Sequence, residues 1–202
     1  MYSRRSQVWR WGETMKHTLA VLVENKPGVL MRVAGLFARR GFNIASITVG
    51  VTDNPQVSRM TIVVHEDSHS LEQVSKQLSK LVNVLKVAAL DEEESVSREL
   101  ALIKVRCDPS MRVNLLNMVN VFRAKVVDVA RDSCIVECTG DERKIDALLE
   151  LLREFDIKEV VRTGRIALNR GARTIEDEVS QRTGGAEPWL TSTTNLTGIS
   201  GS

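Results

Sequence analysis

Between Lys16 and Glu24 the chain alternates Leu19, Val21 and Val23 with Thr18, Ala20, Leu22 and Glu24, which is the period of a β-strand with one firmly buried face. Apolar residues then recur at helical spacing from about Gly28 to Arg40, and Gly41 is expected to end the helix. The same two periods predict strands over 43–52, 57–65 and 84–90 and a second helix from Ser68. The order βαββαβ belongs to the α+β class and is typical of a ferredoxin-like domain, an antiparallel four-stranded sheet with two helices on one face.

The second half of the chain repeats this outline. Strands are expected around 101–105, 125–130, 134–138 and 157–161, with helices around 115–122 and from Asp141. A charged break over 91–95 separates the two ferredoxin-like βαββαβ domains. We therefore divide the chain into a flexible N-terminal extension (1–15), a first domain (16–90), an acidic linker (91–97), a second domain (98–171) and a tail expected to be disordered (172–202).

The predicted strand from Asn43 to Val51 lies at a sheet edge in this fold. It contains no Pro, Lys or Glu, so it would be an aggregation hazard unless another chain covers it. We expect a second copy to pair with it and form a symmetric homodimer with a continuous eight-stranded sheet. Simple alternation places Ile47, Val49 and Val51 on one face of this strand and Ile44, Ser46 and Thr48 on the other.

The turn between the first strand and the first helix is the predicted ligand site. Pro27 has a fixed φ that suits the first turn of a helix, and Gly28 leaves the backbone N–H groups of the helix start open to approach. These groups have no partner inside the helix, and the helix dipole adds positive partial charge, so a small carboxylate is the expected ligand. A turn with no ligand is the alternative interpretation. The predicted site comprises Asn25 and Asn43 as polar contacts, Pro27 and Gly28 in the turn, and Val29, Leu30 and Ile44 as apolar lining.

Composition argues against several other functions. The formal net charge of +2 favours no polyanionic partner, and the aromatic content of 4% is low for a surface that stacks nucleic-acid bases. No apolar run is long enough to span a membrane, and the three cysteines suit a reducing compartment. His65 and His69 alone do not make a zinc site, and no phosphate-binding loop occurs. No set of nucleophile, base and orienting group is evident, so we expect no catalytic residue and no metal site.

Residues 25–30 and 35–44 resemble the opening of an ACT domain, specifically that of the acetolactate synthase (acetohydroxyacid synthase) small regulatory subunit. Their sequences are Asn-Lys-Pro-Gly-Val-Leu and Gly-Leu-Phe-Ala-Arg-Arg-Gly-Phe-Asn-Ile. Further blocks extend the resemblance to about 16–171, and ordinary ACT domains lack these later blocks. They lie at 58–61, 77–84, 98–100, 121–124 and 161–164.

The resemblance implies a non-catalytic regulatory subunit that activates the thiamine-diphosphate-dependent large catalytic subunit of branched-chain amino acid biosynthesis. It also implies feedback inhibition by valine, in some relatives by leucine or isoleucine, bound at the ACT dimer interface. Thiamine diphosphate, Mg and FAD are then expected only in the large subunit. The bacterial cytoplasm, or alternatively the plastid stroma, is the expected location.

One departure from the family pattern bears on the ligand. Ala45 stands where many relatives have Glu, which affects any polar contact beside Asn43 and therefore the preferred amino acid. A free-standing ACT-domain amino-acid sensor that acts on another enzyme or on a transcription factor is the alternative function.

Overall fold

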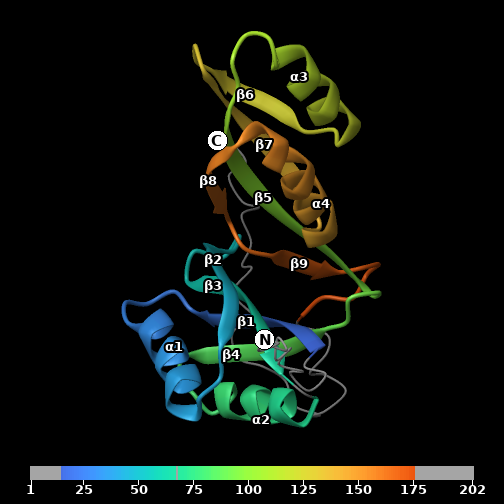
Figure 1. Cartoon of the computed structure of the whole chain (residues 1–202). Helices are drawn as coiled ribbons and strands as arrows, with labels where there is room; N and C mark the ends of the chain where they lie inside the picture. The colour runs from blue at the N-terminus through green and yellow to red at the C-terminus, as the bar shows by residue number, and fades with distance from the viewer. Residues whose placement is uncertain (1–14, 67, 176–202) are drawn as a thin grey trace, which may run out of the picture.

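A computed structural model describes residues 15–66 and 68–175. The predicted N-terminal extension and most of the predicted disordered tail lie outside these residues. The described chain forms two βαββαβ units, each with one antiparallel sheet, stacked end to end with a short strand between them (Figure 1). The predicted α+β class and ferredoxin-like fold are confirmed.

The first unit forms a four-stranded sheet in the order β2-β3-β1-β4, with the two helices on the face that points away from the second unit (Figure 1). This face carries the alternating apolar residues of β1, and Leu19 and Val21 are fully buried in the core there. Burial of each such aliphatic side chain stabilises the fold by about 1.5–3 kcal/mol. The elements are β1 (Met15–Glu24), α1 (Val29–Arg40), β2 (Ile44–Val51), β3 (Val57–Glu66), α2 (Ser68–Leu78) and β4 (Val84–Leu90).

Strand β2 lies at the sheet edge as predicted, but its two faces differ from the predicted alternation. The register with β3 shifts between Ile44 and Ser46, which makes Ala45 a β-bulge. The extra residue changes the parity of the strand, so Ile44 and Ile47 both pack against the core beneath the helices. The prediction that Ile44 lies on the opposite face from Ile47 is therefore wrong.

The second unit has the strand order β6-β7-β5-β8 and packs its helices on one face of the sheet. The three cysteines, Cys107, Cys134 and Cys138, are buried in this core as free thiols. Asp141 caps α4 by accepting a hydrogen bond from the backbone N–H of Lys144 at 2.8 Å. The elements are β5 (Ser95–Arg106), α3 (Arg112–Val121), β6 (Lys125–Val129), β7 (Ser133–Gly140), α4 (Glu142–Leu152), a 3₁₀ turn (Arg153–Phe155) and β8 (Ile157–Arg162).

The connection between the units is shorter than the predicted linker because β5 begins at Ser95. Residues 95–98 of β5 pair with an additional strand, β9 (Ile166–Asn169), which the periodicity did not predict. Only Ala167 of this strand is buried, while Ile166 and Leu168 are largely exposed. A four-residue strand with a single buried position has too few alternations to stand out in the sequence.

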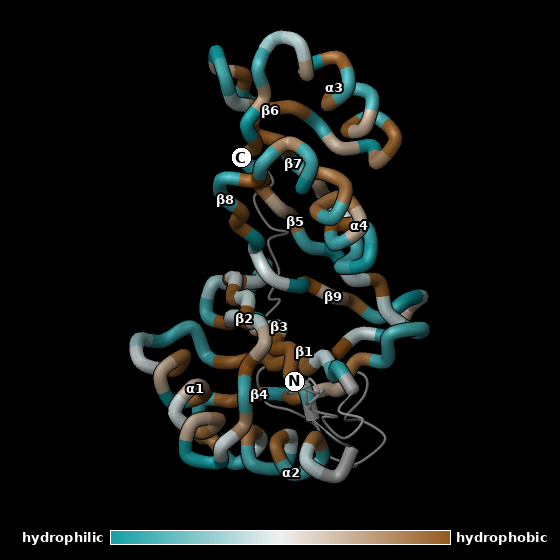
Figure 2. Tube along the Cα trace, in the orientation of Figure 1, coloured by the Kyte–Doolittle hydropathy of each residue, from teal (hydrophilic) through white to brown (hydrophobic). Residues whose placement is uncertain are grey.

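Strand β9 covers the face of the first sheet that its helices leave open. Ala167 and Ile175 form a small core with Ala20, Leu22 and other buried residues of that face. Figure 2 shows hydrophobic residues along the strands of the first sheet, which lie between the helical layer and β9. Arg59 of β3 also donates a hydrogen bond to the carbonyl of Ala167 at 2.8 Å. The first sheet is thus packed on both faces.

No helix among the described residues is long and apolar enough to cross a membrane.

Candidate functional site

The turn that precedes α1 is a β-turn closed by a backbone hydrogen bond. The N–H of Val29 donates to the carbonyl of Lys26 at 3.4 Å, with Pro27 and Gly28 as the two central residues. Gly28 has φ +83°, in the left-handed region that glycine adopts without steric cost. Pro27 therefore lies in the turn and not in the first helical turn, which corrects the role predicted for it.

The N-terminus of α1 is open to an anionic ligand. Its first intrahelical bond runs from the N–H of Arg32 to the carbonyl of Gly28. Among the described residues, the N–H groups of Leu30 and Met31 have no acceptor, and α1 has neither a side-chain cap nor an acidic residue in its first turn. A Cβ atom on Gly28 would meet nothing within 4 Å. The helix dipole therefore faces accessible space with two free donors.

Asn25 holds the turn against the loop between β2 and β3. Its backbone N–H donates to the carbonyl of Gln56 at 2.7 Å, and its side-chain amide donates to the carbonyl of Pro55 at 2.9 Å. The residue is exposed. Asn25 thus fixes the relative position of the turn and the loop that follows the edge strand.

The charges beside the turn are largely compensated. Glu24 accepts hydrogen bonds from the side chains of Asn83 and Lys26, and these contacts hold the pKa of its carboxyl below the usual value. The amide oxygen of Asn83 in turn accepts from Arg32 of α1 at 2.5 Å. These contacts tie the end of β1 to α1 and leave the helix N-terminus as the uncompensated positive end.

The predicted apolar lining divides between core and surface. Val29 is buried in the core of the first unit, and Ile44 packs against the same core from β2. Leu30 and Met31 are the exposed apolar residues next to the turn, 44% and 76% accessible. Met31 was not among the predicted lining residues, although this residue directly follows Leu30 in the first helical turn.

Within one chain the predicted site residues form two separate groups. Ile44 pairs with Val64 at one end of β3, whereas Glu24, where the turn begins, pairs with Val57 at the other end. Val57 and Val64 are seven positions apart along β3, a distance of roughly 23 Å at 3.3–3.4 Å per residue. Asn43 and Ile44 therefore cannot contact a ligand held at Gly28 of the same chain.

The corresponding turn of the second unit is closed by its own side chains. Asp108 accepts hydrogen bonds from the backbone N–H and the hydroxyl of Ser110, which hold the pKa of its carboxyl below the usual value. Arg112 in the first turn of α3 donates to the carbonyls of Ala130 and Arg131 at 2.7 and 2.8 Å. A carboxylate and an arginine thus occupy the region that stays open in the first unit.

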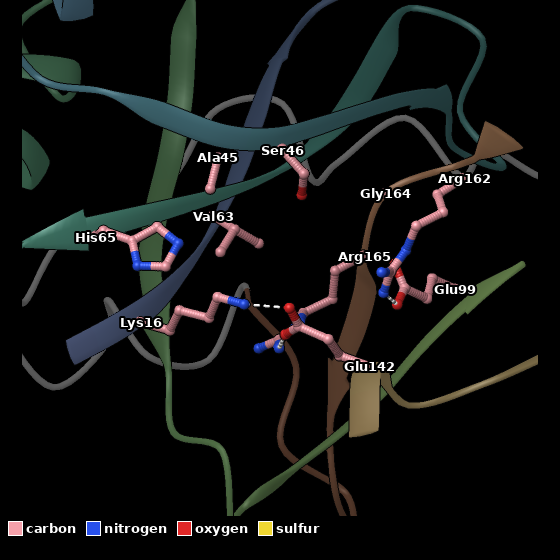
Figure 3. A pocket seen from close by; sticks show the side chains of 10 residues that line it. All are labelled: Lys16, Ala45, Ser46, Val63, His65, Glu99, Glu142, Arg162, Gly164 and Arg165. Carbon is pink, nitrogen blue, oxygen red and sulfur yellow. Dashed lines mark hydrogen bonds and ion pairs between the residues drawn. The ribbon is translucent and has the colours of Figure 1, made fainter. Parts of the chain in front are cut away.

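A second hollow of about 410 Å³ lies between the two units (Figure 3). Lys16 of β1 and Arg165, which directly precedes β9, both contact the carboxylate of Glu142 at the start of α4. Arg162 contacts Glu99 and Asp146 on the side of the second unit. The cations Lys16, Arg162 and Arg165 that line this hollow are therefore paired with carboxylates. This cluster was not predicted from the sequence, because its ion pairs join residues of different elements that only folding brings together.

No group of three or more His, Cys, Asp or Glu side chains with the geometry of a metal site occurs in the described part of the chain. The buried cysteines belong to the core of the second unit. Burial, followed by the contact with Cys134, raises the pKa of the Cys107 thiol to about 11. This thiol is therefore neutral near pH 7 and packs as a small apolar group.

Comparison with known proteins identifies both units. Residues 19–86 match the family described as the acetohydroxyacid synthase (AHAS) small subunit-like ACT domain, and residues 98–171 match the family described as the small subunit of acetolactate synthase. A protein of Archaeoglobus fulgidus named probable acetolactate synthase small subunit is 57% identical over 157 residues, which cover 78% of this chain and 98% of that protein. The acetolactate synthase small subunit of Mycolicibacterium smegmatis is 53% identical over 162 residues, 80% of this chain and 95% of that protein.

A solved structure supports the same assignment over both units. The crystal structure of the acetolactate synthase small subunit from Thermotoga maritima superposes with a TM-score of 0.74 at 46% identity, covering 79% of this chain and 99% of that one. These matches confirm the resemblance inferred from residues 25–44 and from the later sequence blocks. The chain belongs to the family of acetolactate synthase small subunits.

Proposed function

We propose that this chain binds an acetolactate synthase catalytic subunit, raises its activity and makes it sensitive to feedback inhibition by valine. Family membership over both units supports this function, because the small subunits at 53–57% identity match nearly their whole length. Thiamine diphosphate, Mg and FAD would be held by the catalytic subunit. The reaction would then take place in the partner, in the cytoplasm of a bacterium or in a plastid.

The main observation in support of an effector site is the open N-terminus of α1 next to Gly28. An amino-acid carboxylate would accept hydrogen bonds from the free N–H groups of Leu30 and Met31. The aliphatic side chain of the ligand would lie against the exposed part of Leu30. Such a contact favours valine, leucine or isoleucine over serine or aspartate, whose polar groups would lose water without gaining a partner.

The complete site would require two copies of the chain. Strand β2 is an edge strand, and antiparallel pairing with its symmetry mate would bring Ile44 of one copy opposite Val51 of the other. Val51 directly precedes the loop that Asn25 holds through Pro55 and Gln56. The homodimer would thus bring Asn43 of one copy towards the turn of the other, which explains why the two groups lie apart in one chain.

Two measurements test this function. The chain is mixed with purified acetolactate synthase catalytic subunit, and acetolactate formation is followed with and without valine. Isothermal titration of the chain alone with valine, leucine, isoleucine, serine and aspartate measures the effector preference. We expect activation, inhibition by valine, and binding of the three branched-chain amino acids within about 1–3 kcal/mol of one another, because apolar pockets distinguish single methylenes weakly.

Either of two results would refute the proposal. A chain that neither binds nor activates the catalytic subunit would favour a free-standing sensor. Binding of serine or aspartate without valine would place the effector in a different kind of site.

A further inference from the structure

Strand β2 uses each of its sides for a different contact. Ile44 and Ile47 pack against the core under the helices, and the outer edge pairs with no other strand of the described chain. Ser46 and Thr48 lie on the opposite face, together with Val63 and Thr61 of β3. This face meets the segment that connects β8 to β9, so the same strand contacts both structural units.

The contact between β2 and this segment is close. The hydroxyl of Thr48 donates to the carbonyl of Thr163 at 3.3 Å. Gly164 has φ +85°, and a Cβ atom there would lie 2.9 Å from Oγ1 of Thr48 and 3.4 Å from Cβ of Ser46. The missing side chain of Gly164 therefore lets the connecting segment lie directly on the edge strand, as Figure 3 shows for Gly164 and Ser46.

The same segment is fixed firmly to the second unit. Thr163 exchanges hydrogen bonds with Leu100 of β5: its N–H donates to the Leu100 carbonyl at 3.0 Å, and its hydroxyl accepts from the Leu100 N–H at 3.1 Å. The preceding residue, Arg162, contacts Glu99 and Asp146. Displacement of β2 would therefore push on a segment that is bonded to the central strand of the second sheet.

We propose that the contact of Thr163 and Gly164 with Ser46 and Thr48 transmits effector binding from the first unit to the second. This inference rests on the proposed function, in which the effector lies between the α1 turn of one copy and Asn43 and Ile44 of the other. Asn43 and Ile44 lie at the start of the same strand whose centre contacts Gly164. An effector that repositions β2 acts on the second unit through this contact, while the binding site itself lies elsewhere.

The variant Gly164→Ala tests the proposal with a matched control. A methyl group at residue 164 displaces either the Thr48 hydroxyl or the connecting segment. Gly171→Ala is the control, because Gly171 also has a positive φ of +70° but a Cβ atom there would meet nothing within 4 Å. Both variants carry the backbone strain of a side chain in the left-handed region, and only Gly164→Ala disturbs the contact with β2.

The readouts are valine affinity of the chain by calorimetry, activation of the catalytic subunit, and the valine concentration for half-maximal inhibition. For Gly164→Ala we expect valine affinity and activation within about twofold of the unmodified chain. The valine concentration for half-maximal inhibition should rise by about tenfold, which is within the range of typical allosteric couplings. Gly171→Ala should match the unmodified chain in all three. Hydrogen exchange adds a direct readout: valine should change the exchange of 163–169 in the unmodified chain and not in Gly164→Ala.

Each alternative result is informative. Unchanged inhibition in Gly164→Ala overturns the inference and leaves the proposed function intact. Loss of valine binding together with inhibition also overturns it, because the contact would then support the binding site itself. No valine binding by the unmodified chain refutes the proposed function and, with it, this inference. If Gly164→Ala does not fold, Thr48→Val, which keeps the shape and removes the hydroxyl, must weaken inhibition without weakening binding, or the proposal fails.

Discussion

Gly28 meets two requirements at once. Its φ of +83° lies where an L side chain costs roughly 1–2 kcal/mol, and its missing side chain leaves the N–H groups of Leu30 and Met31 accessible. The turn requires the positive φ, and the proposed ligand requires the missing side chain. A substitution at Gly28 must therefore be compared with one that imposes the same strain.

Gly28→Asp is expected to make the complex resistant to valine and leave activation intact. The added carboxylate repels the ligand carboxylate and occupies the space above the helix N-terminus. Loss of one charge-assisted hydrogen bond removes about 1.5–3 kcal/mol, which is roughly ten- to a hundred-fold in affinity. Calorimetric titration with valine measures the change. Gly28→Asn has the same shape without the charge and should retain more affinity; equal losses in both variants would mean that strain or bulk, not charge, is responsible.

The three cysteines are expected to be unreactive in the folded protein. Each is at most 2% exposed, and burial raises the pKa of Cys107 to about 11 and also raises that of Cys138. Since the thiolate is the reactive form, a chromogenic disulfide reagent at pH 8 should label no cysteine of the native chain quickly. All three should react after unfolding in guanidinium. Fast labelling of a thiol before unfolding would show that the core of the second unit opens readily.

Helix α4 connects the two units through its first residue. One carboxylate oxygen of Glu142 accepts from Lys16 of β1, and the other accepts from Arg165 at 2.9 Å. Burial alone would raise the pKa of this carboxyl, but the hydrogen bond and charge of Lys16 and the charges of Arg165 and Arg162 hold it below 4.5. A depressed pKa stabilises the folded chain above the unfolded value, and the stabilisation is lost as the pH falls through the folded value.

Glu142→Gln is therefore expected to destabilise the chain most near pH 7. An ion pair of this exposure is worth about 1 kcal/mol or less, and the difference from the unmodified chain should shrink as the pH falls below 4.5. Urea unfolding at pH 7 and pH 3.5 measures the difference in unfolding free energy between the variant and the unmodified chain. Glu150→Gln on the same helix is the control, because its pair with Arg153 is far more exposed. A destabilisation by Glu142→Gln that grows towards acid pH would contradict the depressed pKa of the Glu142 carboxyl.

The outer edge of β2 has no pairing strand among the described residues, so a single chain leaves this edge exposed. Val49 and Val51 are 44% and 59% exposed, although both pair with residues of β3 on the inner side of β2. The edge strand β6 of the second unit also exposes apolar residues, but it carries Lys125 and Asp128, charges that oppose edge-to-edge pairing. The comparison of these two edge strands therefore predicts association through β2 and not through β6.

Val49→Lys is expected to convert the homodimer into a monomer at micromolar concentration. In the proposed pairing each lysine would lie opposite Ser46 of the other copy, and placing a charged side chain in the paired edge is unfavourable. Sedimentation measures the mass, and valine titration should show weakened binding because the site needs both copies. Val127→Lys in β6 is the control and should remain dimeric. If the unmodified chain is monomeric, the proposed two-copy site is excluded.

Periodicity was sufficient for most elements of this fold, because a strand with one buried face and a helix with one buried stripe leave regular patterns. Leu19 and Val21 marked the buried face of β1, and Gly41, which has φ +73°, ends α1 as predicted. The open helix N-terminus after Gly28 was also predictable, since a glycine follows the strand and no acidic residue or capping side chain follows it. These features depend only on neighbouring residues.

Other features depended on contacts between distant residues. A one-residue bulge at Ala45 moves Ile44 to the same face as Ile47 without a composition signal, and β9 forms because residues 95–98 offer it a partner. The ion pair of Lys16 with Glu142 and the contact of Gly164 with Thr48 join residues more than a hundred positions apart. Sequence spacing therefore determined the elements and the turn, whereas three-dimensional packing determined which elements touch, since those contacts arise only when both units are folded.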